Sequence, residues 1–179
     1  MKRLDRMPTY IHMTMAFMGG LWGAYSVVQW TNLGNAHTTN LIKIVLRLID
    51  GDWLEFALCV GSAFLYFLAL SAYWSKHSKS DLRYAVIIVE AVSLAAVYFF
   101  PQNWPVYTRL YPCVFATAFQ WSIFCGAQGF NCATIFNSNN YRQFSSSFAE
   151  VYLNKDPSFR PKMKFFGCTL LFYHFGVVY

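Results

Sequence analysis

The chain has 179 residues, of which 56% are hydrophobic and 20% aromatic, while only 12% are charged. An average soluble domain carries about 25% charged residues, so this composition argues against an ordinary soluble protein. The net charge of +6 does not predict a nucleic-acid partner, because the basic residues lie between apolar blocks. We therefore predict one all-α, polytopic membrane domain over residues 1–179.

Five apolar blocks follow one another along the chain, at residues 11–30, 54–74, 84–100, 110–130 and 163–179. Backbone groups in lipid must bond within their own segment, so each block is predicted to be a spanning helix. A span needs about 20 residues. Because the last block is short and still apolar at Tyr179, it is expected to be cut short, with a sixth span following.

The Lys and Arg residues between the blocks predict the orientation in the membrane, because cytoplasmic loops are rich in these residues. Placing the N-terminus in the cytoplasm puts three basic residues outside, Lys43, Arg47 and Arg109. Eleven then lie inside: Lys2, Arg3, Arg6, Lys76, Lys79, Arg83, Arg142, Lys155, Arg160, Lys162 and Lys164. The N-terminus is therefore predicted to be cytoplasmic.

Two short polar segments stand at corresponding places. The first polar segment, residues 35–40, follows the first block, and the second polar segment, residues 137–142, follows the fourth. Each leads into a stretch with one polar stripe that is expected to lie in the interface or to return toward the membrane. The order of features predicts two repeats, about 1–100 and about 105–179. Three spans in each repeat invert the second copy, an arrangement common in transporters.

At these segments the chain resembles a known family. "NAHTTN" resembles the NAQTGN-type signature of the YoaK family, also called DUF1275, and "GAQGFNCATIF" followed by "NSNNYRQ" resembles its second signature. The resemblance covers nearly the whole chain, and within the family the chain resembles the branch found in Gram-positive bacteria. It implies a bacterial inner-membrane protein of about six spans and names no activity. The family's usual acidic residue in the first span is Gly23 here, and its TGN turns read Thr38-Thr39-Asn40 and Ser138-Asn139-Asn140.

Polar residues beside broken spans are the first candidates for a binding site. Amide and hydroxyl groups at such breaks can coordinate an ion or bond to a solute, and helix ends add partial charge. The alternative is helix capping, with Thr39 or Asn40 as one N-cap and Asn139 or Asn140 as the other. The candidate residues are Asn35, His37, Thr38, Thr39, Asn40, Gln128 (at the end of the fourth span), Asn131, Asn137, Asn139, Asn140 and Arg142.

Glu90 is a separate candidate, because it lies in the middle of the third apolar block. An ionisable residue at that depth is costly and is a functional hypothesis by default. It could carry a proton or bind a cation. The alternative is a hydrogen-bonded carboxyl group that holds two helices together.

Enzyme signatures are absent from the sequence: it contains no GxSxG, HExxH, P-loop or GxGxxG motif. The five cysteines are interpreted as packing residues, and no metal site, cofactor or enzymatic activity is expected. We expect transport of a small solute or cation by alternating access across the lipid bilayer, by a chain that could form a homo-oligomer. The alternative is a non-transporting membrane subunit that binds a partner protein or lipid.

Overall fold

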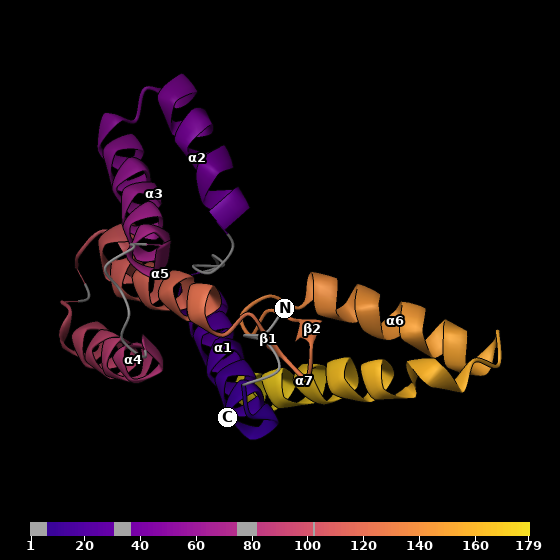
Figure 1. Ribbon diagram of the computed structural model, residues 1–179. Helices are drawn as coiled ribbons and strands as arrows, with labels where there is room; N and C mark the ends of the chain where they lie inside the picture. Colours follow the sequence, from indigo (N-terminus) through magenta and orange to yellow (C-terminus); the bar gives the residue numbers. More distant parts are fainter. Residues whose placement is uncertain (1–6, 31–36, 75–81, 102) are drawn as a thin grey trace. The chain divides into compact units, whose positions relative to one another are not determined.

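The structure, a computed structural model, describes residues 7–30, 37–74, 82–101 and 103–179 (Figure 1). The described residues are all-α apart from one short β-hairpin, and four of the five apolar blocks lie in long helices, whereas the fourth block, 110–130, is helical only as far as Ile123. The elements are α1 (Thr9–Trp30), α2 (His37–Asp50), α3 (Trp53–Trp74), α4 (Leu82–Phe99), α5 (Val106–Ile123), β1 (Gly126–Ala127), β2 (Phe130–Asn131), α6 (Ser138–Tyr152), the short 3₁₀ helix η2 (Pro157–Phe159) and α7 (Arg160–Val178).

Contacts within the chain divide it into two compact units. Unit 1 combines Met1–Ala24 with Phe124–Tyr179, and unit 2 is Tyr25–Ile123. The two units do not coincide with the predicted repeats, which were residues 1–100 and 105–179. The repeats therefore remain a prediction, based on the order of elements along the chain.

In unit 2, α5 packs against both α3 and α4, and α2 packs against α3. The inner stripe of α3 is formed by Cys59, Ser62, Tyr66 and Ala69, which recur at helical spacing and are buried. Tyr111 of α5 donates its hydroxyl to the Leu58 carbonyl oxygen at 2.8 Å, which joins α5 to α3.

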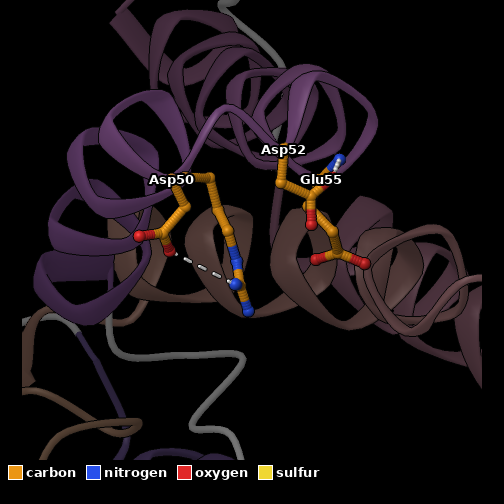
Figure 2. Close-up of polar contacts among 4 residues, drawn as sticks. Asp50, Asp52 and Glu55 are labelled. Atoms are coloured by element: carbon orange, nitrogen blue, oxygen red, sulfur yellow. Dashed lines mark hydrogen bonds and ion pairs between the residues drawn. The ribbon is translucent and has the colours of Figure 1, made fainter.

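The turn between α2 and α3 follows directly from its residues. Gly51 has a φ of +74°, a left-handed conformation that favours glycine after a helix. The N–H of Asp52 donates to the Arg47 carbonyl oxygen at 3.1 Å and that of Gly51 to Leu48 at 3.4 Å, the Schellman pattern. Asp52 then caps α3, because its Oδ1 accepts the Glu55 N–H at 3.2 Å. Figure 2 shows Asp50, Asp52 and Glu55 at this turn, where Arg47 Nη1 lies 3.7 Å from Asp50 Oδ2.

Helix α2 exposes its apolar face. Its half-buried basic residues, Lys43 and Arg47, share the inner side with Asn40, and Lys43 Nζ lies 5.7 Å from the centre of the Tyr107 ring of α5. A surface helix of a soluble protein shows the opposite pattern, with its apolar face turned toward the core. The exposed apolar residues are Leu41, Ile42, Val45, Leu46, Leu48 and Ile49.

Two of the described helices are long and apolar enough to cross a membrane, over Trp53–Ala72 of α3 and Leu82–Phe99 of α4. Only 22% and 17% of their residues are buried within the protein. The core helix of a soluble protein would be mostly buried. Large apolar side chains of these helices, such as Phe64, Phe67 and Ile88, are instead exposed.

In unit 1 the chain leaves the helical state earlier than the apolar block 110–130 predicts. Helix α5 ends at Ile123, and β1 pairs antiparallel with β2 around a turn at Gln128 and Gly129, whose φ angles are +53° and +78°. Placing Gln128 at the end of the fourth span was therefore wrong. Two residues with positive φ make the tight hairpin turn that matches the twist of the strands.

The core of unit 1 lies where this hairpin meets α1 and α7. Met13, Ala127, Cys132, Phe165 and Phe166 form the buried apolar cluster. The non-helical stretch 124–135 is buried against these helices at Phe124, Ala127, Cys132, Thr134 and Ile135.

Candidate functional site

The first polar segment is split between an inner and an outer face. His37 and Asn40 point inward, with Asn40 only 1% exposed, whereas Thr38 and Thr39 are exposed. Helix α2 begins at His37, so Thr39 and Asn40 lie inside it and the prediction that one of them is its N-cap was wrong. The helical period of 3.6 residues explains the split, since positions 37 and 40 share one face. Asn35 lies outside the described residues.

His37 makes the closest ring contact of the described part of unit 2. Its imidazole stacks on the Tyr66 ring of α3, with centroids 4.0 Å apart and planes 4° apart. Tyr66 in turn lies 6.4 Å from the Trp121 ring of α5, centroid to centroid. Tyr66 of α3 thus contacts a ring of α2 and a ring of α5. Neither aromatic partner was predicted, since each lies in an apolar run and only the three-dimensional fold brings it to His37.

Three buried polar atoms on α2 and α3 have no hydrogen-bond partner among the described residues: His37 Nδ1, Asn40 Oδ1 and Ser62 Oγ. Further atoms of this kind lie on other helices, among them both ring nitrogens of His12 and Glu90 Oε1. Ser62 is 1% exposed and was not predicted, because a lone serine in an apolar span gives no signal of its own. Buried polar groups are normally paired, so unpaired ones call for a specific explanation.

Glu90 is buried in unit 2, 4% exposed, halfway along α4. It shares the buried stripe of this helix with Val86 and Ser93. Because α5 is the main helix packed on α4, this stripe faces α5. Its Oε1 has no hydrogen-bond partner among the described residues. The structure thus places a buried carboxyl group halfway along an apolar helix, while its role stays a prediction.

The second polar segment belongs to unit 1, and its residues serve different purposes. Asn137 is the N-cap of α6, but its side chain makes no capping bond and its Oδ1 is buried without a described partner. Asn139 is exposed and accepts a hydrogen bond from Arg142 Nη2 at 3.2 Å. Because α6 starts at Ser138, the prediction that Asn139 or Asn140 caps it was wrong.

Asn140 organises the irregular stretch before α6. It is fully buried, and its Nδ2 donates to the carbonyl oxygens of Ala133 at 2.7 Å and Phe136 at 3.0 Å. Its Oδ1 accepts from the Cys132 thiol at 3.2 Å. Cys132 Sγ also lies 3.7 Å from the Thr169 hydroxyl of α7. The residues of this bonded group hold the loop in place, and neither Cys132 nor Thr169 was predicted to take part.

Gln128 and Asn131 lie in the hairpin, apart from any buried polar cluster. Both are exposed, and Gln128 Nε2 donates to the Thr9 hydroxyl of α1 at 2.8 Å. This bond fastens the hairpin to the start of α1. Neither residue is placed to line an interior site.

Metal-ligating side chains do not cluster in the described part of the chain: no group of three or more His, Cys, Asp or Glu residues there could hold a metal ion. All five cysteines are free, and Cys59, Cys113 and Cys132 are buried. The unpartnered polar atoms of α2 and α3 are neutral amide, hydroxyl and imidazole atoms.

In a comparison with known families, residues 11–178 match the family DUF1275, described as a protein of unknown function. No curated protein and no solved structure matches the chain. The match covers both polar segments, Glu90 and all seven α-helices apart from the first two residues of α1. The chain therefore belongs to the DUF1275 family.

Proposed function

We propose that the protein is a polytopic membrane protein that moves a small solute or ion by alternating access, with Glu90 as the ionisable group on the path. The observation that carries the proposal is the burial of Glu90 halfway along a helix fit to span a membrane, with one carboxyl oxygen unpartnered among the described residues. Such a group is costly to keep in an apolar helix and is retained where it performs a task.

The membrane arrangement we propose is six spans in two inverted repeats, in a bacterial inner membrane, with the N-terminus in the cytoplasm. The order long helix, amphipathic helix, long helix occurs twice, as α1–α2–α3 and as α5–α6–α7. Asn40 and Asn140 are both buried within the first turn of the amphipathic helix. The excess of Lys and Arg on one side supports the orientation.

The experiment is electrical recording from the full chain in proteoliposomes adsorbed on a solid-supported membrane. Solution exchanges deliver sodium, potassium or ammonium ions, or a pH step. We expect transient currents from the wild type and their loss in Glu90→Gln. Glu150→Gln makes the same chemical change outside the apolar helices and should keep the currents. Currents of wild-type size in Glu90→Gln, or a silent wild type with every solution, would overturn ion transport through Glu90.

A second function is favoured by a different observation. The side-chain amide of Asn140 donates its hydrogen bonds to the loop before α6. Helices α2, α3 and α4 expose broad apolar faces. Both features suit a non-transporting membrane subunit that binds a partner protein, a lipid or a second copy of this chain. A silent wild type that purifies as a defined complex or homo-oligomer in light scattering would put this function first.

A further inference from the structure

Two side chains of unit 2 are nearly inaccessible and hold oxygen atoms without a described partner. Asn40 of α2 and Ser62 of α3 are each 1% exposed, and neither Asn40 Oδ1 nor Ser62 Oγ has a hydrogen-bond partner among the described residues. One helical turn before Asn40, the His37 Nδ1 atom is also buried and unpartnered. Leaving a buried polar atom unpaired costs about 1–3 kcal/mol. Three unpaired polar atoms thus lie on two helices that pack against each other, and a ligand that bonds to them would remove this cost.

The register of the α2–α3 hairpin brings these atoms to one level. The chain reverses at Gly51, and His37 and Tyr66, which stack, lie 14 and 15 residues from it. Asn40 and Ser62 each lie 11 residues from Gly51, so they face each other one turn closer to the reversal. Both point to the inner side, because His37 and Asn40 share one face of α2 while Ser62 and Tyr66 share one face of α3. The site is therefore built by two rigid helices.

The chemistry of the three atoms selects the class of ligand. An amide oxygen, a hydroxyl oxygen and an imidazole nitrogen are acceptors of hydrogen bonds or ligands of a cation. The three side chains include no carboxylate, so a calcium or magnesium ion would lack its usual ligands. Transition metals are disfavoured too, since the described residues hold no cluster of His, Cys and acidic groups. Lys43, the next basic residue along α2, lies over the Tyr107 ring.

We propose that His37, Asn40 and Ser62 form a binding site for a small monovalent cation, an alkali metal ion or ammonium. Neutral oxygen ligands replace the hydration shell of such ions in membrane proteins, and an ammonium ion offers donors for all three acceptors. The inference rests on the proposed function, since it names the class of ion, and adds Ser62 to the site. Binding is measured without transport, so the two can fail separately.

The test is thermal unfolding of the full chain in detergent at pH 8, where an ordinary imidazole is neutral. Sodium, potassium or ammonium chloride is titrated against choline chloride at constant ionic strength. We expect the unfolding temperature to rise saturably with at least one of the three ions, as linkage requires. A rise with ammonium alone or with an alkali metal ion alone supports the site and shows which of the two kinds of cation it binds.

Three variants test the ligands. Ser62→Ala should weaken the apparent affinity about tenfold or more, because a hydrogen bond or ligand to a charged group is lost. Asn40→Asp should strengthen it, because a carboxylate replaces a neutral oxygen. Ser71→Ala is the control, because it makes the same substitution at another serine of α3. Its unfolding temperature should respond to the cations like that of the wild type.

The proposal is overturned if the wild type unfolds at one temperature in all four salts, as expected for a water molecule alone. It is also overturned if Ser62→Ala and Asn40→Asp keep the wild-type affinity. Cation binding without currents in proteoliposomes would retain the binding site and reject ion transport. Currents without cation-dependent stability would retain ion transport and reject the binding site.

Discussion

His37 and Tyr66 stack face to face, with 4.0 Å between ring centroids and 4° between ring planes. The contact holds the start of α2 against α3, far along the hairpin from its turn. Tyr66→Leu removes the stack, whereas Tyr66→Phe retains it. A double-mutant cycle of Tyr66→Leu with His37→Leu should give a coupling of about 0.5–1.5 kcal/mol. The measurement is the free energy of unfolding by chemical denaturation in detergent, and a coupling near zero would show that the rings only touch.

Gly51 is the residue on which the α2–α3 turn depends. No atom lies within 4 Å of where its Cβ would be, so only its φ of +74° opposes a side chain. Gly51→Ala is expected to lower the free energy of unfolding by about 1–2 kcal/mol. Gly51→Asn should cost less, because asparagine adopts the left-handed conformation more readily. Equal costs for the two variants would show that backbone conformation is not the reason for this glycine.

The sequence predicted the long helices because length and apolar composition suffice to place them. It did not predict the end of α5 at Ile123, since Cys125, Ala127 and Phe130 continue the apolar composition through the hairpin. The local signal was the pair Gly126 and Gly129, which permit positive φ.

The candidate site was predictable only in part. Helical periodicity separates His37 and Asn40 from Thr38 and Thr39 once the start of α2 is known, but a polar segment can either cap a helix or form its first turn. Ser62 and Tyr66 reach the site through tertiary packing. The bond between Cys132 and Asn140 likewise depends on how the irregular stretch 124–135 folds, which no periodicity encodes.

Asn140→Ala tests the loop before α6. The change removes the hydrogen bonds that Asn140 Nδ2 donates to the carbonyl oxygens of Ala133 and Phe136, each worth about 0.5–1.5 kcal/mol. The free energy of unfolding should fall accordingly, and amide hydrogen exchange should rise over residues 132–137. Asn139→Ala is the matched control, because this exposed side chain contacts only Arg142 among the described residues and should change stability by less than about 0.5 kcal/mol. Similar losses in both variants would contradict the assigned role of Asn140.

Asp156, in the turn between α6 and α7, gives a pH dependence. Its carboxylate accepts the Ser158 N–H at 2.9 Å at the start of η2, and hydrogen bonding to Ser158 lowers the pKa of Asp156 below its ordinary value. A lowered pKa means that the bond stabilises the turn above the ordinary pKa of about 4. This stabilisation is lost as the pH falls through the lower, folded value. Hydrogen exchange at Ser158, corrected for its intrinsic rate, should show reduced protection below pH 4. In Asp156→Asn the protection should not depend on pH, and a parallel loss there would assign the effect to another group.

Gly20 of α1 and Gly176 of α7 allow these two helices to cross at close range within unit 1. A Cβ at Gly20 would collide with the Tyr173 carbonyl oxygen, and one at Gly176 would collide with the Phe17 carbonyl oxygen. Small residues at such crossings let helix backbones approach each other in membranes. Gly20→Ala and Gly176→Ala should each cost about 1–3 kcal/mol, because backbone rather than side chain must move.

The matched control for this crossing is Gly167→Ala on the same helix as Gly176. Its Cβ would meet only the Phe144 ring, at 3.1 Å, and a ring can turn aside. The double variant Gly20→Ala/Gly176→Ala should cost less than the two single changes together, because either one already separates the helices. Strict additivity, or a loss in Gly167→Ala as large as that in Gly176→Ala, would show that the two glycines do not act on one crossing.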